Sequence, residues 1–435
     1  MSQPFRLNKE GLINRNKKIS FTFNGKKLFG YEGDTIASAL IANGIHLVGR
    51  SFKYHRPRGF FGAGVEEPNA KLQVEFNGHS EPNVNATEME LVEGLSATSQ
   101  NCWPSVNFDV GAINNFLKMF FPAGFYYKTF MWPKSFWYKI YEPFIRKAAG
   151  LGVASIEKDK ERYEHKFEYC DLLVTGSGPS GLASAYAAAK NGAKVILAED
   201  KPRFGGTLLT DDVSIDNLSG KDWAEKIITE LKSMPNVTVK NRSQVFGYYD
   251  HNMLVMFERV SDHLEKKSKF TPRQRLWYIR AKETILSTGS IERPIVFGNN
   301  DTPGIFLSAA AKEYMKVYGV LVGKKPLIFT NNDSAYETAI SLFQKGINVE
   351  AIIDNREEVD SKLVKEIEKN NIKIYKGYTV VNTFGYKKIN KISIMQLSKD
   401  GQRVVGSKIS IDCDCLGMSG GWTPAVHLLL SLIHI

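Results

Sequence analysis

The clearest pattern of apolar and polar positions in this chain surrounds a glycine-rich turn. An apolar run at residues 172–175 leads into Gly176-Ser-Gly178-Pro-Ser-Gly181, and an alanine-rich stretch of helical pattern follows. A second apolar run at 195–198 then ends at Glu199. Strand, glycine turn, helix, strand and terminal acid, in that order, predict the first βαβ unit of a dinucleotide-binding Rossmann fold. The alternative is a glycine turn in a βαβ unit that binds no ligand.

Each position in this motif has a physical role. Gly176 permits the tight turn out of the strand, Gly178 lets a pyrophosphate approach the backbone, and Gly181 lets the helix pack closely on the strand. The free N–H groups at the helix N-terminus attract phosphate. Glu199 stands where an acid takes the ribose hydroxyls. Because it would repel a 2′-phosphate, NAD or FAD fits better than NADP.

A second pattern covers the N-terminal part of the chain. Alternating apolar residues at 18–31, on either side of Asn24-Gly25, predict a hairpin with a type I′ turn. A helix is expected next, with its stop at Gly44, and a later strand at 72–76. Hairpin, helix and strand predict a small β-grasp domain over residues 15–100, which is the layout of a plant-type ferredoxin.

The cysteines argue against a metal centre in this domain. A ferredoxin places C-x4-C-x2-C after the helix, whereas residues 56–69 contain no cysteine, so no iron–sulfur cluster is expected. The chain has four cysteines in all, with no C-x-x-C pair and no histidine at zinc-ligand spacing. We expect buried structural thiols and no metal site. The four are Cys102, Cys170, Cys413 and Cys415.

A second βαβ pattern follows, but its fingerprint is degenerate. A strand at 327–330 is expected to lead into a helix that ends at Gln344. Thr330, Asn332 and Ala335 stand where the three glycines would be, and the first two side chains would keep a pyrophosphate from the backbone. One dinucleotide site therefore looks intact and one degenerate. This argues against a flavin reductase fed by NAD(P)H, because that class normally needs both.

Two further stretches are expected near the first cofactor site. A strand pattern at 277–287 ends in Thr288-Gly289. Residues 412–424 are interpreted as the last strand of the split first domain, a Gly420-Gly421 turn and a helix starting near Pro424. No helix stop signal follows this helix, which favours a truncated reading frame.

Residues 116–145 are crowded with aromatic side chains, interrupted by lysines and prolines. These interruptions argue against a membrane span. Such a segment can bury a large apolar area. An interface with another protein chain fits this composition as well as a linker packed on its own chain does.

Composition adds little to this picture. A length of 435 residues allows two or three domains, and an apolar content of 43% is ordinary for a soluble protein. The formal charge of +11 allows nucleic acid, an acidic partner protein or an anionic substrate as a partner. No nucleic-acid motif is present, so an ordinary basic surface is preferred. Neither a signal peptide nor a membrane span is recognisable, and a cytoplasmic protein is expected.

Several stretches resemble the α subunit of heterotetrameric sarcosine oxidase, and the resemblance extends to about residue 428. They are Gly49-Arg-Ser-Phe-Lys-Tyr-His-Arg-Pro-Arg-Gly59, Pro122-Ala-Gly-Phe-Tyr-Tyr-Lys-Thr-Phe-Met-Trp-Pro133, Ser290-Ile-Glu-Arg-Pro294, Asn299-Asn-Asp301 and Ser419-Gly-Gly-Trp-Thr-Pro424. The resemblance implies an N-terminal ferredoxin-like domain without a cluster, followed by an NAD-binding domain.

The resemblance also implies partners. In that family the α subunit carries NAD, the β subunit carries FAD and oxidises the amine, and an FMN is shared at the α–β interface. The γ and δ subunits complete the assembly. A further C-terminal domain of the α subunit, which is aminomethyltransferase-like, takes tetrahydrofolate and has no counterpart in these residues. The reaction converts sarcosine to glycine, with formaldehyde or 5,10-methylenetetrahydrofolate and hydrogen peroxide as the other products.

Carried over by position, the resemblance places NAD on a set of turn residues, none of which is a catalytic acid or base. In chain order they form the pyrophosphate loop, the acids at the ribose, the next loop and the turns that close the site. The expected cofactor-binding residues are Gly176, Gly178, Pro179, Ser180, Gly181, Glu199, Asp200, Gly205, Gly206, Thr207, Thr288, Gly289, Gly420, Gly421 and Trp422.

The predicted fold class is α/β. It comprises a ferredoxin-like β-grasp domain at 1–100 without its cluster, an aromatic connecting segment at 101–165 and a Rossmann-type NAD-binding domain at 166–435. A second βαβ domain is inserted in the last of these at about 320–400.

Three alternative functions remain. One is the α subunit of a related opine, D-hydroxyproline or amine dehydrogenase, against which the missing ferredoxin cysteines argue. Another is a non-catalytic scaffold subunit stiffened by NAD. The third is a free-standing FAD-dependent NAD(P)H reductase, which the degenerate second fingerprint disfavours.

Overall fold

The computed structural model describes residues 2–76, 78–121, 124 and 130–430. The chain forms two compact units. The first unit comprises Met1–Glu157 and Glu292–Gly421, and the second comprises Lys158–Ile291 and Trp422–Ile435. Within the described ranges, no helix is long and apolar enough to cross a membrane.

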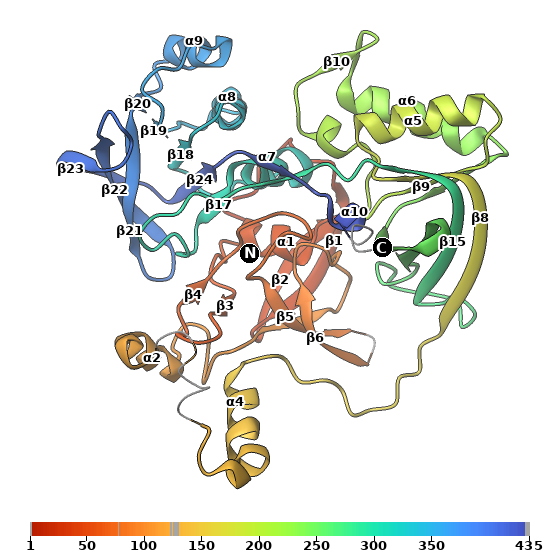
Figure 1. The fold of residues 1–435 in the computed structure, drawn as a ribbon, viewed down its shortest axis with the longest axis horizontal. Coiled ribbons are helices and arrows are strands. Elements are labelled where there is room, and N and C mark those ends of the chain that lie inside the picture. Colours follow the sequence, from red (N-terminus) through yellow and green to blue (C-terminus); the bar gives the residue numbers. More distant parts are fainter. Residues whose placement is uncertain (1, 77, 122–123, 125–129, 431–435) are drawn as a thin grey trace. The chain divides into compact units, whose positions relative to one another are not determined.

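The N-terminal half of the first unit is a five-stranded sheet with one helix, in the strand order β2-β1-β7-β5-β6 (Figure 1). Its hairpin turn has φ 49° at Asn24 and φ 76° at Gly25, as a type I′ turn requires. The helix begins after Thr35, whose hydroxyl accepts the backbone N–H of Ser38, and Gly44 with φ 80° follows its end. The predicted β-grasp fold is confirmed. Its elements are β1 (Asn14–Phe23), β2 (Lys26–Glu32), α1 (Ile36–Ala42), β3 (Gly49–Arg50), β4 (Pro57–Arg58), β5 (Lys71–Phe76), β6 (His79–Asn85) and β7 (Ser96–Ser99).

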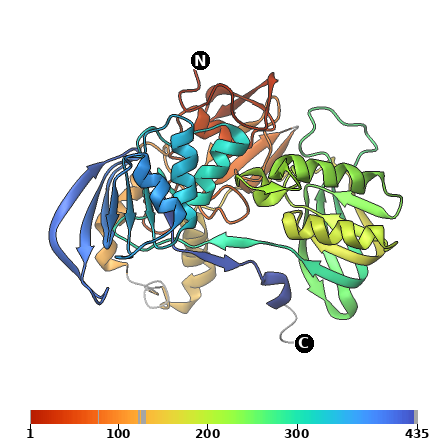
Figure 2. The same cartoon turned by 90° about the horizontal axis from the view of Figure 1, so that it is seen from above.

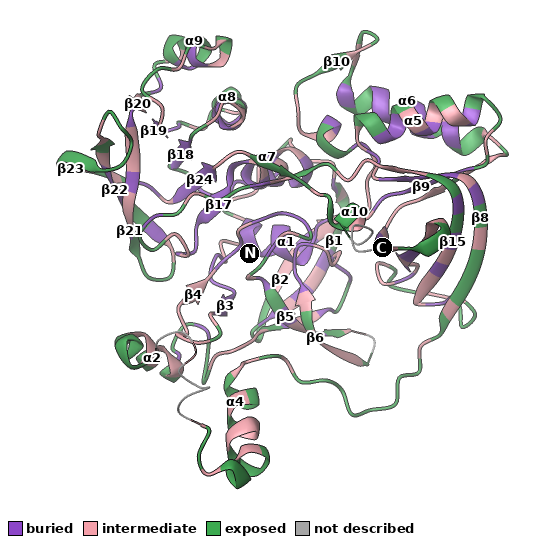
Figure 3. Cartoon of the chain, viewed as in Figure 1, coloured by how far each residue is buried: buried purple, intermediate pink, exposed green. Residues whose placement is uncertain are grey.

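The aromatic segment forms short helical turns whose side chains are mostly exposed (Figure 3). These turns are η1 (Val110–Ala112), α2 (Ile113–Phe116), η2 (Lys118–Phe120), η3 (Lys134–Phe136), η4 (Trp137–Tyr141) and α4 (Glu142–Ala148). Part of the predicted aromatic set, namely Phe125, Tyr126 and Tyr127, lies outside the described residues, as do Pro122 and Lys128.

The C-terminal half of the first unit is a five-stranded parallel sheet in the order β17-β24-β18-β19-β20. A three-stranded antiparallel sheet, β21-β22-β23, packs its apolar side chains into the same core. The second βαβ pattern is confirmed, because β18 ends at Thr330 and α8 ends at Gln344. The elements are β17 (Ile305–Leu307), α7 (Ser308–Tyr318), β18 (Pro326–Thr330), α8 (Ser334–Gln344), β19 (Ala351–Asp354), α9 (Lys362–Lys369), β20 (Ile374–Lys376), β21 (Tyr378–Gly385), β22 (Ile389–Leu397), β23 (Val404–Asp412) and β24 (Cys415–Ser419).

The placement of β24 corrects one prediction. This strand pairs with β17 and β18 and is buried along its whole length, so the prediction that it completes the sheet of the first dinucleotide domain is wrong. A strand buried on both faces fits the interior of either parallel sheet, and its local pattern cannot select between them. The helix expected near Pro424 is also wrong at that position. Residues Trp422–Pro424 form β25, and α10 (His427–Leu430) begins later.

The second unit is a six-stranded sheet in the order β12-β9-β8-β15-β14-β13. The first four strands are parallel, and β14 and β13 extend the sheet antiparallel. Where the chain passes between the units, β16 (Ser290–Glu292) pairs with β25. The remaining elements are β8 (Tyr163–Thr175), α5 (Pro179–Lys190), β9 (Val195–Ala198), η5 (Gly206–Leu209), β10 (Ser214–Ile215), β11 (Leu218–Ser219), α6 (Gly220–Ser233), β12 (Val237–Lys240), β13 (Ser243–Tyr249), η6 (Asp250–Asn252), β14 (Met253–Arg259) and β15 (Gln274–Leu286).

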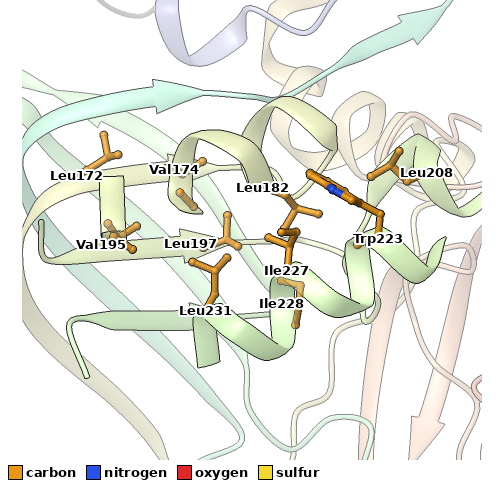
Figure 4. Packing of buried hydrophobic residues seen from close by; sticks show 13 residues of the cluster. Leu172, Val174, Leu182, Val195, Leu197, Leu208, Trp223, Ile227, Ile228 and Leu231 are labelled. Atoms are coloured by element: carbon orange, nitrogen blue, oxygen red, sulfur yellow. The ribbon is translucent and has the colours of Figure 1, made fainter. Parts of the chain in front are cut away.

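Helices α5 and α6 lie side by side on one face of this sheet (Figure 2). Leu182 of α5 and Ile227 of α6 meet Leu197 of β9 in the layer between them (Figure 4). The α6 residues that face the sheet recur at three- and four-residue spacing, which is why this stretch is a helix. This core holds the end of β8, and with it the glycine turn, in a fixed position.

Candidate functional site

The glycine turn after β8 requires glycine at two of its positions. Gly176 has φ 96°, and a Cβ there would lie 2.2 Å from the carbonyl oxygen of Ser287. A Cβ at Gly181 would lie 2.0 Å from the carbonyl oxygen of Gly176. These contacts are the tight turn and the close helix–strand packing that the sequence predicts.

Gly178 differs from these two because the space in front of it is open. A Cβ built on Gly178 would have no heavy atom within 4 Å. Gly178 is also the N-cap of α5, and no side chain caps the helix there. Pro179 has no N–H to satisfy, and the N–H groups of Ser180 and Gly181 point out of the first turn. The backbone therefore offers an uncapped, positively polarised helix end to an anion.

The next loop lies directly against this opening. The N–H of Gly205 donates to the carbonyl oxygen and to the Oγ of Ser177, each at 3.1 Å. A Cβ on Gly206 would lie 3.0 Å from the Cα of Gly178. Thr207 follows in the 3-10 turn η5. The structure thus brings the predicted loop at 205–207 beside the predicted phosphate loop.

Glu199 closes the other side of this loop. Its side chain is buried at the end of β9, and Oε2 accepts the backbone N–H of Ser177 at 2.9 Å and its Oγ–H at 2.5 Å. The backbone N–H of Lys201 donates to Oε1 at 3.0 Å. Burial, followed by the neighbouring Asp200, raises the pKa of Glu199 to about 8. The carboxyl group is therefore neutral below about pH 8 unless a further donor stabilises its ionised form.

Ser177 is a functional position that sequence reasoning missed. It occupies a variable place between two fingerprint glycines, so the motif itself assigns it no role. Its side chain is fully buried and connects Glu199 to Gly205. The feature of the sequence that could have indicated this role is the small hydroxyl side chain between the two glycines.

The predicted closing residues divide between the two units. In the second unit, the N–H of Thr288 lies 3.6 Å from the Cβ position of Gly176, and the Thr288 hydroxyl donates to the carbonyl oxygen of Ala425 at 2.6 Å. Gly289 has φ 67° and open space in front of its Cα. Trp422 belongs to the second unit and is partly exposed. Gly420 and Gly421 belong to the first unit, where they bond to the backbone of Arg293.

The second fingerprint is filled by its own side chains. The Asn332 amide nitrogen donates to the Oγ of Ser419 at 3.0 Å and to its carbonyl oxygen at 3.2 Å. The Asn332 amide oxygen accepts from the N–H of Ser334 at 3.1 Å, and the Thr330 hydroxyl donates to the carbonyl oxygen of Asn332 at 2.8 Å. These bonds occupy the place where a pyrophosphate would meet the turn.

The carboxylate at the end of the second βαβ unit also already accepts hydrogen bonds from its own chain. Asp354, the last residue of β19, is fully buried. It accepts from Arg356 Nη2 and from the Tyr336 hydroxyl, each at 2.8 Å. The carboxylate that would take ribose hydroxyls is therefore held by a guanidinium and a phenol of the same chain.

Two family models match parts of this chain. Residues 16–102 match a 2Fe-2S iron-sulfur cluster binding domain. Residues 171–252 match an FAD dependent oxidoreductase. The second match covers the glycine turn, Glu199 and the loop at 205–207.

Of two related proteins, one matches nearly all of the chain and the other matches about a third of it. The alpha subunit of sarcosine oxidase from Rhizobium meliloti is 47% identical over 98% of this chain and 42% of its own length. An opine oxidase subunit from Agrobacterium tumefaciens is 27% identical over 37% of this chain and 33% of its own length. This chain thus spans less than half the length of these relatives.

Among solved structures, the L-proline dehydrogenase from P. horikoshii has a TM-score of 0.61 at 19% identity. The match covers 98% of this chain and 64% of that chain. It shows that the two share a fold.

The residues of the first matched domain do not fit an iron–sulfur cluster. Residues 16–102 contain a single cysteine, Cys102, whereas a [2Fe–2S] cluster needs four protein ligands. In the part of the chain that the structure describes, no three His, Cys, Asp or Glu side chains are placed to hold a metal ion. The glycine turn of the second unit, in contrast, does fit a dinucleotide, because Gly178 leaves the uncapped end of α5 open.

Proposed function

This chain belongs to the family of sarcosine oxidase alpha subunits, whose N-terminal portion it matches, and we propose that it is the NAD-binding part of such a subunit. The open helix end at Gly178 carries this proposal, because it is the feature a pyrophosphate needs. The second fingerprint, closed by Asn332, supports a single dinucleotide per chain.

In the proposed complex, this chain's residues bind and orient the cofactor. The N–H groups of Ser180 and Gly181 meet the pyrophosphate, and the carboxylate of Glu199 accepts the adenosine ribose hydroxyls. NAD, when bound, can accept or donate a hydride, but no acid or base of this chain is proposed to act on it. Its proposed role is to stiffen the loops around Gly178 and Gly206.

The proposed reaction belongs to the whole enzyme rather than to this chain. The β subunit, with FAD, would take a hydride from the N-methyl group of sarcosine, and water would split the resulting imine into glycine and formaldehyde. With tetrahydrofolate, the one-carbon unit would leave as 5,10-methylenetetrahydrofolate. The two electrons would pass from the FAD to the FMN shared with the β subunit, and oxygen would accept them there, forming hydrogen peroxide. We place the complex in the cytoplasm and expect this chain alone to be inactive.

Exposed apolar side chains support a docking surface for the β subunit. Phe116, Met119 and Trp132 are 85%, 87% and 82% exposed. Side chains so exposed are not packed on their own chain, which favours the interface over the linker as the role of the aromatic segment. Lys118 and Lys134 among them favour a partner surface that carries acidic groups. The γ and δ subunits have no proposed contact here.

The opine oxidase relative supports one alternative substrate class for the whole enzyme. Its match covers a smaller part of this chain at lower identity, so the α subunit of a related opine, D-hydroxyproline or amine dehydrogenase is the second candidate. A non-catalytic role for this chain, in which bound NAD only stiffens the subunit, is compatible with either substrate class.

Cofactor content tests the proposal most directly. The full chain is purified and denatured, and the released nucleotide is identified by absorbance and mass. We expect NAD at up to one per chain, with no flavin and no iron, and oxidase activity only after the β subunit is added. Stoichiometric FAD together with NADH-dependent dye reduction would overturn the proposal in favour of a free-standing reductase.

A further inference from the structure

Glu67 is a buried carboxylate in the loop between β4 and β5. Its side chain is 2% exposed, and both oxygens accept only backbone N–H groups in the contacts found. Oε2 accepts from Phe61 at 2.6 Å and Gly62 at 2.7 Å. Oε1 accepts from Asn69 at 2.6 Å and Ala70 at 3.2 Å. Burial raises the pKa of Glu67, while these four bonds oppose that shift by stabilising the ionised form.

The spacing of these contacts follows the ligand pattern of a plant-type ferredoxin. A C-x4-C-x2-C motif with its second cysteine at Glu67 would have its first at Gly62 and its third at Ala70. Glu67 binds the backbone N–H of both positions. A Cβ at Gly62 would lie 2.5 Å from Oε1 of Glu66, so a cysteine there would require the Glu66 side chain to move.

Loops that hold iron–sulfur clusters direct backbone N–H groups at the cluster, because the cluster and its thiolates are negatively charged. This loop has the same excess of inward N–H groups but no thiolate. Two carboxylates supply the charge. Glu67 takes the four groups described above, and Oε1 of Glu66 takes those of Ala63 at 2.8 Å and Gly64 at 3.0 Å.

We propose that the Glu67 carboxylate replaces the iron–sulfur cluster as the anion on which the loop at 59–70 folds. This replacement explains how residues 16–102 can match an iron–sulfur domain although they lack its cysteine ligands. The loop keeps its fold because its N–H groups keep an anionic partner. The redox centre is lost, and the domain does not carry electrons.

The same loop also forms hydrogen bonds that connect the two halves of the first unit. The carbonyl oxygen of Phe61 accepts the N–H of Leu307 at 2.8 Å, and that of Gly62 accepts the buried Tyr314 hydroxyl at 3.0 Å. The N–H groups of the same two residues bond to Glu67. The carboxylate thus holds Phe61 and Gly62 from one side, while Leu307 at the end of β17 and Tyr314 in the middle of α7 hold them from the other.

Amide hydrogen exchange on the unaltered chain is the first test. The N–H groups of Phe61, Gly62, Asn69 and Ala70 have Glu67 as their acceptor, so we expect slow exchange at these positions. Exchange as fast as in an unstructured loop would overturn the proposal. The same chain is incubated anaerobically with iron and sulfide. We expect no cluster absorption, and assembly of a cluster would also count against the proposal.

Glu67→Gln is the decisive variant, with Glu66→Gln as its matched control. The amide nitrogen of glutamine cannot accept, so two N–H groups lose their partner while side-chain volume is kept. We expect exchange at 59–70 and at 307–314 to rise by about tenfold or more, and Tm to fall by about 5 °C or more. Glu66→Gln should affect mainly residues 63 and 64. Equal effects of the two substitutions would refute the proposal. If Glu67→Gln does not fold, the exchange data on the unaltered chain decide.

Discussion

The hydroxyl of Ser177 donates to the carboxylate of Glu199 across 2.5 Å, which joins the glycine turn after β8 to the end of β9. The same hydroxyl accepts the N–H of Gly205. Hydrogen bonds therefore link the phosphate loop, the ribose acid and the loop at 205–207. A cofactor that binds one of them would meet all three in place.

The affinity for NAD should depend on pH through Glu199. Burial raises its pKa to about 8 in the free chain, so the carboxyl is protonated at lower pH. Two ribose hydroxyls would donate to the ionised form and lower this pKa, so binding releases a proton below pH 8. The dissociation constant should fall as pH rises, by up to about tenfold per unit, and level off above about pH 8.

Isothermal titration of the cofactor-free chain with NAD between pH 6.5 and 9 measures this dependence. Glu199→Gln is the control, because its amide does not titrate in this range. It should bind more weakly at high pH and show a flat profile. A dissociation constant that is independent of pH in the unaltered chain would contradict the ribose role of Glu199.

Substitutions at Gly178 and Gly181, in the same turn, should affect different properties. The first should weaken NAD binding, and the second should lower folding stability. At Gly178 the backbone has φ −66° and ψ −176° and open space for a Cβ, so Gly178→Ala should leave Tm within about 2 °C. The added methyl would occupy the approach of the pyrophosphate, and NAD binding should weaken by about tenfold or more. Equal NAD affinity in Gly178→Ala and the unaltered chain would contradict the proposed cradle.

Gly181→Ala is the counterpart. Its Cβ would lie 2.0 Å from the carbonyl oxygen of Gly176, which is backbone and cannot rotate away. We expect a loss of about 2 kcal/mol or more in the free energy of unfolding of the second unit, measured by urea denaturation with and without NAD. A variant as stable as the unaltered chain would show that α5 can shift away from β8.

The first unit should lose stability in mild acid because of His46. Both ring nitrogens are buried and have no hydrogen-bond partner among the residues that the structure describes, and Phe5 packs edge-on against the ring. Burial, and to a smaller extent Lys388, lowers the pKa of His46 to about 3 from its ordinary 6.5. Below pH 6.5 the imidazole of His46 takes up a proton in the unfolded chain, whereas in the folded chain it stays neutral down to about pH 3. Stability is therefore retained above pH 6.5 and lost progressively as pH falls towards 3.

Between pH 7 and pH 5 this group should remove about 2 kcal/mol from the free energy of unfolding. His46→Leu has no proton to gain and should lack this part of the pH dependence. Denaturation of both proteins at the two pH values checks the difference. Identical losses in the two would show that the histidine is not the source.

The exposed aromatic segment should matter for assembly and not for folding. Phe116→Ser combined with Met119→Ser removes two side chains that are almost fully exposed, so Tm of the chain alone should stay within about 2 °C. Affinity for the β subunit, measured by co-purification or titration, should fall by about tenfold or more. Phe270→Ser, in the second unit, removes another exposed phenylalanine and serves as the control. Equal losses in both variants would argue against a localised docking surface.

Short-range patterns were enough to predict much of this protein. The hairpin at Asn24-Gly25, the end of α1 at Gly44 and the turn at Gly176 each depend on a few neighbouring residues with special backbone angles. The βαβ order around Gly178 and Glu199 predicted the candidate site because the fingerprint spans one local unit. The lack of cysteine ligands for an iron–sulfur cluster could also be read from the sequence, since residues 16–102 contain only Cys102.

Only the tertiary structure decided the long-range choices. The strand β24 joined the sheet of β17 and β18 because a strand apolar on both faces suits any parallel interior, and packing alone selects its neighbours. The local sequence assigns Glu67 no role, and only the fold brings four N–H groups around it. Asn332 and Ser419 meet across 87 residues. A sequence specifies local backbone angles directly, but which buried polar groups meet depends on the whole packing arrangement.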